Sequence, residues 1–331
     1  MIEISASGSA IRHQGWYTGS ETSGASVMRR GTGMTEKQID ARNEPPEGAP
    51  ALNSHVIDAL LPQEIALKAE TIGVAKAKRD ALSLLTLAVL AGAFIAFGAI
   101  FMITTIAGAG AMPFGMVRLI GGTVFSLGLI LVVIGGAELF TGNNLMVMAW
   151  AGRMISLGAL LRAWAIVYVG NFIGAVGTAG LVFLSGWPGL GQAQVGRTAL
   201  AIAAAKADIP FLEALFLGIL CNVLVCLAVW LSFSARTVVG KVVAIVPPIA
   251  AFVAAGFEHS VANMFFFPVA LAIKWGAPAG FWAAAQASAA DFQTITVAAA
   301  IGNLVPVTIG NVIGGGVLVG AVYWFVYLRQ R

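Results

Sequence analysis

Long apolar runs occupy most of the chain after residue 80, and short loops hold most of the charged residues between them. About 20 helical residues cross the hydrocarbon core of a bilayer. Runs of this length therefore predict six transmembrane helices. The second, fifth and sixth runs are too long for one simple crossing, so we expect tilted, protruding or broken helices there. The expected spans lie within residues 81–111, 119–152, 163–185, 211–234, 242–273 and 292–328.

Acidic residues interrupt the second and the fifth of these runs. Glu138 lies in the glycine-rich segment 135–144, and Glu258 precedes His259 in a run, 242–273, that otherwise has no charged residue before its end. Ionisable groups at membrane depth usually face a protein interior or a water-filled path. Non-helical backbone is tolerated there only in the same places. The two breaks therefore predict a polar conduit across a membrane.

The breaks also carry the candidate chemistry. Imidazole changes its charge near neutral pH, so we expect His259 to exchange protons with a weak acid in transit. Thr141 can offer a hydroxyl group, and a half-helix beginning near Gly142 would offer backbone N–H groups to an anion. A structural alternative stands for Glu138 and Glu258, which would accept hydrogen bonds from exposed N–H groups at the breaks.

A short repeat divides the membrane region into two halves. The third span contains the sequence Gly-Asn-Phe-Ile-Gly at 170–174, and the sixth contains Gly-Asn-Val-Ile-Gly at 310–314. Three spans per half give the halves opposite orientations in a membrane. Inverted repeats of this kind place their site at discontinuous helices near the midplane. Glycines four residues apart also let helices approach closely, which is a packing role without any function.

The N-terminal region differs in kind from the rest of the chain. Residues 1–52 are rich in Gly, Ser, Thr, Pro and charge, so we expect a disordered extension. Residues 53–79 should contain an interfacial helix over 62–78, with a solvated linker helix as the alternative, and residues 80–331 should form the channel domain. Met28 and Met34 are alternative starts, so the sequence leaves open whether residues 1–33 are native.

Composition and charge agree with a multi-pass membrane protein. Hydrophobic residues make up 59% of the chain and charged residues 10%, with a mean hydropathy of +0.89. Nine Lys and Arg residues flank the spans on the N-terminal side of the membrane and four on the other, which predicts that both termini are cytoplasmic. The net charge of +4 follows from these loops, so we expect no nucleic-acid partner.

Several segments together resemble the formate–nitrite transporters. The most specific is the stretch Gly-Phe-Glu-His-Ser-Val-Ala-Asn-Met at 256–264, and the likeness extends from about residue 56 to the C-terminus. The resemblance implies a bacterial inner-membrane homopentamer whose subunits have an aquaporin-like fold of six helices, three plus three, with helices 2 and 5 broken. The other segments that carry it are 125–129, 138–142, 217–222 and 306–311.

The resemblance also implies roles for individual residues. His259 becomes the central pore histidine, Thr141 its partner, and Lys206 the vestibule lysine. Many formate channels have Asp at the position of Glu138, which leaves the preferred anion open. Asn222 and Asn311 match polar pore-lining positions. The apolar constrictions match Phe125, Leu129, Leu139, Phe140 and Phe252.

We therefore expect a channel or proton-linked transporter for small monovalent weak-acid anions, formate first. Lys206 would gather the anion, although alone it would pass for a lysine that snorkels to the interface. Protonation through His259 would let the neutral acid cross, and permeation of the anion itself is the alternative. Nitrite, hydrosulfide, lactate and acetate remain alternative substrates.

Other classes of protein fit the sequence less well. A water or ammonia channel is disfavoured because no paired Asn-Pro-Ala motif occurs, and a purely structural protein would not need two mirrored breaks. An enzyme is not expected because the sequence offers neither a metal-ligand cluster nor a Ser/His/Asp set. We expect no cofactor and no metal, and the partners are the anion, a proton, lipid and other copies of the chain.

Overall fold

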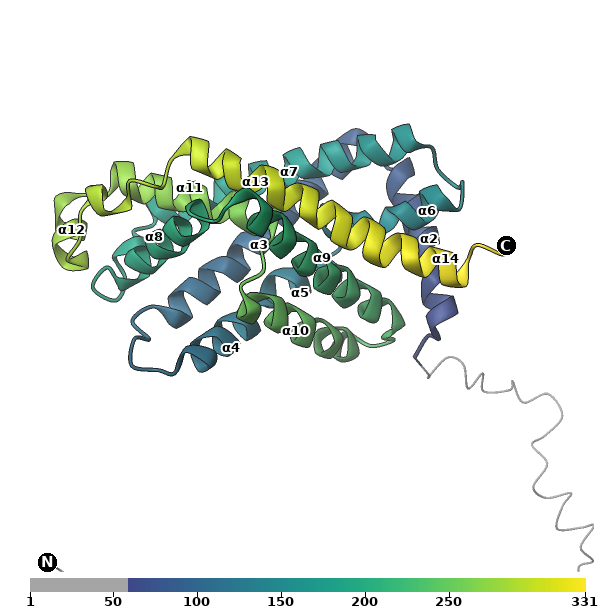
Figure 1. Ribbon diagram of the computed structural model, residues 1–331, viewed down its shortest axis with the longest axis horizontal. Helices are drawn as coiled ribbons and strands as arrows, with labels where there is room; N and C mark the ends of the chain where they lie inside the picture. Colours follow the sequence, from purple (N-terminus) through teal and green to yellow (C-terminus); the bar gives the residue numbers. More distant parts are fainter. Residues whose placement is uncertain (1–58) are drawn as a thin grey trace, which may run out of the picture. The chain divides into compact units, whose positions relative to one another are not determined.

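The computed structural model describes residues 59–331, and that part of the chain folds into helices joined by short non-helical segments (Figure 1). The disorder expected for residues 1–52 lies outside the described residues. In chain order the elements are α2 (Pro62–Lys78), α3 (Ala81–Ile106), α4 (Phe114–Phe125), α5 (Leu127–Gly135), η2 (Gly142–Met146), α6 (Val147–Ala151), α7 (Leu157–Leu184), η3 (Trp187–Gly189), α8 (Gln194–Ala207), α9 (Phe211–Ser234), α10 (Val238–Ala255), α11 (Ser260–Gly276), α12 (Ala279–Ala285), η4 (Ala289–Phe292), α13 (Val297–Val312), η5 (Ile313–Ala321) and α14 (Val322–Tyr327).

Six helical stretches within residues 59–331 are long and apolar enough to cross a membrane, which confirms the predicted number. Four of them begin earlier than predicted, by three to six residues, and two of these starts have a common reason. The stretch formed by α4 and α5 starts at Phe114, and α7 starts at Leu157. For α4 and α7 the predicted span began directly after an arginine, Arg118 or Arg162, that the helix in fact contains. A long arginine stem can lie along an apolar surface while its head reaches polar groups.

Two further helices were not predicted. Helix α8 is 14 residues long, shorter than a membrane span, and it leads to α9. Helix α12 follows α11 after a bend of 112° at Ala277 and Pro278. Both helices are shorter than the roughly 20 residues that cross a bilayer core, so their sequences carry no signal of a membrane span.

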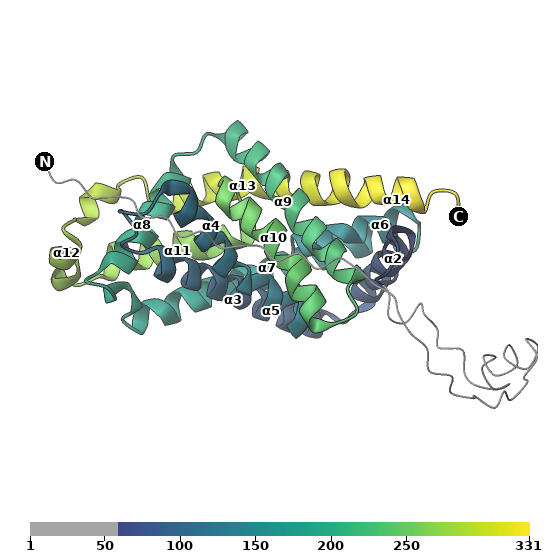
Figure 2. The same ribbon diagram turned by 90° about the horizontal axis from the view of Figure 1, so that it is seen from below.

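The two halves of the membrane region pack in the same way. Helix α3 lies against α7, and α9 lies against α13 (Figure 2). In the first pair a side chain at Gly174 would overlap the carbonyl oxygen of Val89, and in the second a side chain at Gly314 would overlap that of Ile219. The glycines of the repeated pentapeptide therefore bring each pair of helices into backbone contact.

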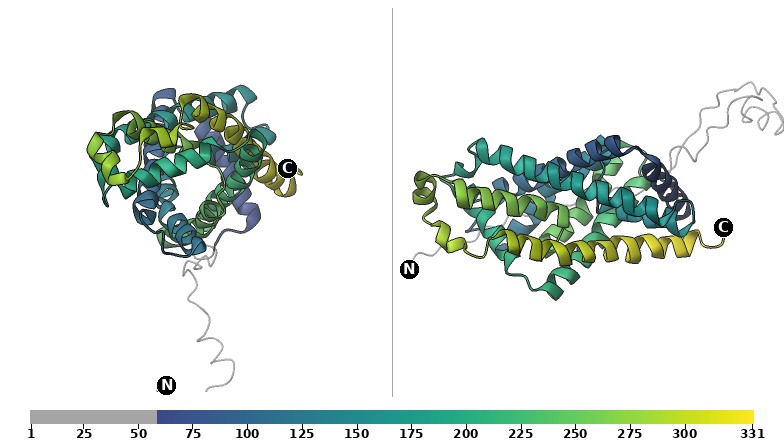
Figure 3. Two further views of the ribbon diagram at one scale, coloured as in Figure 1. Left: turned by 60° about the vertical axis from the view of Figure 1, so that its left-hand side comes forward. Right: turned by 90° about the horizontal axis from the view of Figure 1, so that it is seen from above.

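The sixth span is one continuous helix with a change of winding in its middle. Helix α13 passes directly into η5, a nine-residue π-helix, and then into α14, and Figure 3 shows this helix in yellow along one side of the bundle. The π-helix lies against η2, the short 3-10 helix that follows the break in the second span. Helix α14 then brings the C-terminus to α2, where Arg331 lies 4.0 Å from Glu70.

Candidate functional site

Both predicted breaks are present, and both are made in the same way. Helix α5 ends before Gly136 (φ 77°), and α10 ends before Gly256 (φ 80°). Glycine adopts this left-handed conformation without steric cost. The N–H groups of Ala137 and Phe257, one residue beyond each glycine, donate to carbonyls of the last helical turn at 3.0 Å. Each half therefore stops its helix with a glycine-based cap.

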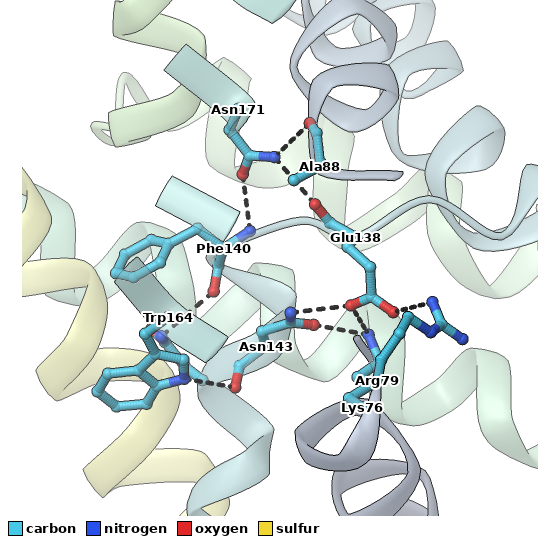
Figure 4. A network of polar contacts seen from close by, with 9 residues as sticks. Lys76, Arg79, Ala88, Glu138, Phe140, Asn143, Trp164 and Asn171 are labelled. Atoms are coloured by element: carbon cyan, nitrogen blue, oxygen red, sulfur yellow. Dashed lines mark hydrogen bonds and ion pairs between the residues drawn. The ribbon is translucent and has the colours of Figure 1, made fainter. Parts of the chain in front are cut away.

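An asparagine from the repeated pentapeptide holds the first break in place. The Oδ1 atom of Asn171 accepts a hydrogen bond from the N–H of Phe140 at 2.8 Å. Its Nδ2 atom donates to the carbonyls of Ala88 at 2.8 Å and Glu138 at 2.9 Å, as Figure 4 shows. Backbone groups buried away from water need such partners. Asn171 satisfies them for the non-helical segment.

Asn311 does the same for the second break. Its Oδ1 atom accepts from the N–H of Ser260 at 2.9 Å, and its Nδ2 atom donates to the carbonyls of Gly218 at 2.8 Å and Glu258 at 3.0 Å. The structural alternative for the two glutamates is therefore wrong, because asparagine side chains, not carboxylates, take the exposed N–H groups. Asn311 was predicted to line a pore, and it is fully occupied with backbone groups instead.

The carboxylate of Glu138 pairs with cations. It lies 2.8 Å from the Nζ atom of Lys76 and 2.9 Å from an Nη atom of Arg79, and it accepts a hydrogen bond from Asn143 at 2.9 Å. Figure 4 shows this cluster beside the Asn171 brace. Glu138 is only 3% exposed, and a buried charge is tolerated when it is paired and hydrogen-bonded.

Glu258 has an equivalent cluster in the other half. Its carboxylate lies 2.6 Å from the Nζ atom of Lys206 and accepts a hydrogen bond from Asn263 at 2.7 Å. Lys206 also lies over the ring of Phe266, 5.3 Å from its centroid. The lysine predicted to attract anions thus belongs to a Lys–Glu–Asn group, in which it forms an ion pair with the acid.

His259 and Thr141 are brought together from opposite halves, although 118 residues separate them. Their Nε2 and Oγ1 atoms lie 2.9 Å apart, and both residues are buried. The Nδ1 atom of His259 accepts the N–H of Ala262 at 3.0 Å and so caps α11. An accepting Nδ1 carries no proton, so the neutral ring bears its proton on Nε2 and donates it to Thr141.

Two cavities lie on either side of this pair. The first, of about 310 Å³, lies where α4 begins and is lined by Lys206, Glu258 and His259. The second, of about 260 Å³, lies where α5 ends and is lined by Lys76 and Glu138. Because α4 and α5 form one span, the cavities are at its two ends. We name them the Lys206 cavity and the Lys76 cavity.

Four of the five predicted constriction residues lie at these cavities. Phe125 and Phe252 line the Lys206 cavity, with their rings edge to face and their centroids 5.8 Å apart. Phe252 also stacks on His259 at 6.0 Å. Leu129 and Leu139 line the Lys76 cavity. Apolar side chains therefore border the histidine–threonine pair on both sides.

Two predicted residues lie elsewhere. The ring of Phe140 packs against Tyr168 at 5.0 Å and Trp164 at 6.1 Å, both on α7, and lines neither cavity. Asn222 likewise lines neither, because its Nδ2 atom donates to Asn144 at 2.8 Å and to the Asn311 carbonyl at 2.6 Å. Adjacent residues in non-helical backbone direct their side chains differently. The sequence alone therefore could not show that Leu139 lines a cavity and Phe140 does not.

The half-helix near Gly142 does not offer the free N–H groups that were expected to bind an anion. The chain resumes there as the 3-10 helix η2, and the N–H groups of Asn143 and Asn144 already donate to the carbonyls of Leu139 and Thr141. These donors are therefore taken. Among residues 59–331 no group of His, Cys, Asp and Glu side chains is arranged to hold a metal ion.

Sequence reasoning missed the cations of α2 and the asparagine beside each acid. Lys76 and Lys206 are 130 residues apart, as are Ala88 and Gly218, which meet the two bracing asparagines. The spacing indicates that α2 and α8 are equivalent helices of the repeat. The pentapeptides are 140 residues apart and the two breaks 120, so no single spacing read from the sequence would have paired Lys76 with Lys206.

Comparison with known proteins identifies relatives over most of the chain. The sequence profile described as "Formate/nitrite transporter" matches residues 63–325. The formate channel FocA of Escherichia coli strain K12 is 47% identical over 275 residues, which are 83% of this chain and 96% of that protein. FocA of Haemophilus influenzae is 40% identical over 79% of this chain and 93% of its own.

Solved structures agree with this assignment. A structure described as a pentameric formate channel with formate bound is 44% identical to this chain and superposes with a TM-score of 0.72, covering 75% of this chain and 98% of its own. A second, described as an FNT family ion channel, is 28% identical with a TM-score of 0.67, covering 80% and 98%.

Proposed function

We propose that this chain, which belongs to the formate/nitrite transporter family, carries formate across a membrane. The family consists of transporters and not of enzymes. The observation that carries the proposal is the hydrogen-bonded pair of Thr141 and His259, buried between two cavities that each contain basic side chains. The relatives named as formate channels support formate over the other weak-acid anions.

The basic side chains of the cavities and the apolar side chains between them contribute differently to selectivity. Basic side chains in each cavity favour a small anion, because clefts lined with one sign of charge concentrate the opposite ion. Phe125 and Phe252 then oppose its passage, since removing a bare charge from water costs far more than removing a neutral molecule. A weak acid can meet both conditions, as an anion in the cavities and as a neutral molecule between them.

In this mechanism His259 exchanges the proton that neutralises formate. The ring must first become doubly protonated, and the hydrogen bond from Ala262 to Nδ1 opposes this. Protonation at Nδ1 therefore requires the ring to release the N–H group that caps α11. Passage of the formate anion past a neutral ring, with Nε2–H as a hydrogen-bond donor, is the alternative within the same proposal.

The setting of the channel is part of the proposal. We place both termini on the cytoplasmic side of a bacterial inner membrane, because Arg331 lies near Glu70 of α2 and basic residues gather at that end. Burial, together with the nearby charges of Lys241 and Arg236, lowers the pKa of Lys68 there. A homopentamer, as in the pentameric relative, completes the proposed assembly.

Uptake by reconstituted protein tests the proposal. Proteoliposomes containing the full chain should take up labelled formate faster than empty liposomes, and faster at pH 5.5 than at pH 7.5. Nitrite, acetate, lactate and hydrosulfide at the same concentration complete the panel. Uptake of one of these at a higher rate than formate would reassign the substrate, and equal rates with and without protein would remove the transport function.

A further inference from the structure

Arg118 lies in the Lys206 cavity and was not among the predicted site residues. It is half-buried on α4 and lines the cavity together with Lys206 and Glu258. Its Nε atom donates to the carbonyl of Ala254 at 3.0 Å, and its Nη2 atom donates to that of Val253 at 2.7 Å. These carbonyls belong to the last turn of α10 and come directly after Phe252 in the sequence.

The charges of this cavity do not cancel. Lys206 and Glu258 form an ion pair at 2.6 Å. Arg118 has no ion pair with an acid of residues 59–331, so with His259 neutral the cavity keeps one positive charge in excess. The Lys76 cavity also has one cation in excess, but there the arginine is used differently, because Arg79 binds Glu138 directly.

The guanidinium group also has donors to spare. Arginine carries five N–H donors in a planar fork, and Arg118 uses two of them on the end of α10. The fork matches the two oxygens of a carboxylate or of a similar small oxyanion. Fixing one edge to the backbone leaves the other edge oriented, so little side-chain entropy is lost when an anion binds.

The position of Arg118 is suited to binding an anion before it reaches the constriction formed by Phe125 and Phe252. Arg118 and Phe125 are seven residues apart on α4, which is two turns and about 10 Å along the same helix face. Gly121 lies between them, lines the cavity and adds no side chain to the path. An anion held at Arg118 would therefore be within the same cavity as the ring pair that closes it.

We propose that Arg118 is an anion-binding residue that receives the carboxylate of the substrate in the Lys206 cavity, before it reaches Phe125 and Phe252. This proposal rests on the proposed function and adds a binding step to one mouth of the channel only. The residue 120 positions later, where the spacing of the two breaks places the equivalent of Arg118, is Val238. The Lys76 cavity thus has no arginine at the equivalent position, and its own arginine, Arg79, is paired with Glu138.

Initial rates of formate uptake in proteoliposomes give the first test. Arg118→Gln should raise the half-saturating formate concentration about tenfold, since a hydrogen-bonded charge is lost, with the saturated rate within about twofold. Arg118→Lys, which keeps the charge but not the fork, should be intermediate. Arg197→Gln is the matched control, because Arg197 also donates to a carbonyl, that of Ala285, but lines neither cavity.

The comparison separates the proposal from a purely structural cap on α10. A cap alone predicts that both Arg118 variants lower the saturated rate or the yield, with no change in the half-saturating formate concentration. That result would overturn the anion site. Absence of formate uptake by the unaltered protein would instead overturn the proposed function, so the two failures are distinct.

Labelling of the unaltered protein decides the matter if the variants do not assemble. Phenylglyoxal modifies arginines, and mass spectrometry of peptides gives the rate at Arg118 and at Arg197. Formate should slow modification of Arg118 in a concentration-dependent way, and neutral formamide should not. Equal rates at Arg118 with formate and with formamide would overturn the proposal, whatever happens to the variants.

Discussion

His259 is held by two hydrogen bonds that fix where its proton lies. Nδ1 accepts the N–H of Ala262, and Nε2–H faces Thr141. The residue therefore has two roles, as the cap of α11 and as the polar group between the cavities. A substitution that keeps the cap and removes the titration can separate these roles.

Asparagine at position 259 makes that separation. Asn is among the preferred N-cap residues, so His259→Asn should keep the start of α11 and yield assembled protein. It has no ionisable group, so the increase in formate uptake between pH 7.5 and pH 5.5 should be lost. The measurement is uptake against pH with folding checked by gel filtration, and a pH profile equal to that of the parent would remove His259 from proton exchange.

The constriction can be tested at Phe252 with Phe140 as its control. Phe252→Ala removes a ring shared with Phe125 and His259, so uptake of acetate and lactate should rise at least severalfold relative to formate. Phe140→Ala removes a ring packed on α7. It should lower stability by about 3–5 kcal/mol without changing the ratio of lactate to formate uptake. The reverse pattern would place the barrier at Phe140.

At the scale of elements, the breaks depend on helices from elsewhere in each half. Asn171 on α7 and Asn311 on α13 supply the hydrogen bonds that the interrupted backbone lacks. Both asparagines can reach only because glycine contacts let α7 approach α3 and let α13 approach α9. Close helix packing is thus a condition for the site and not only for the fold.

Two glycines of α7 test this condition. A side chain at Gly174 would overlap the carbonyl oxygen of Val89, whereas at Gly177 it would meet nothing within 4 Å. Gly174→Ala should therefore destabilise the protein by about 1–3 kcal/mol and reduce formate uptake. Gly177→Ala should leave both unchanged. Thermal unfolding in detergent gives the comparison, and equal melting temperatures for the two variants would contradict the packing argument.

At the scale of the whole molecule, two similar halves form one path whose ends differ. Each half contributes a glycine cap, an asparagine brace and a Lys–Glu–Asn cluster. Within residues 59–331 only the second half has a π-helix, Ile313–Ala321, and the Lys206 cavity alone contains an arginine without an ion pair, Arg118. The symmetry explains the shared scaffold, and the differences give each end its own chemistry.

The assembly is expected to be a pentamer with a separate path in each subunit. Large apolar side chains such as Phe172, Leu181 and Phe216 are exposed on the single subunit, and lipid or neighbouring subunits must cover them. Native mass spectrometry in a mild detergent should show a species of five times the chain mass. Monomers alone at the same detergent concentration would count against the assembly, while leaving transport by one subunit open to test.

Local patterns in the sequence determined the number of spans, the two breaks and the helix over 62–78, because length, apolarity and glycine act within a few residues of each other. The specific stretch around His259 also directed attention to the residue that meets Thr141. Tertiary structure alone decided the rest. The direction of a side chain in non-helical backbone depends on its partners, so Phe140 turned to α7, and Asn222 and Asn311 became braces. Arg118 is held at its cavity by two backbone carbonyls at the end of α10, which are more than 130 residues away in the sequence. No local pattern encodes this contact.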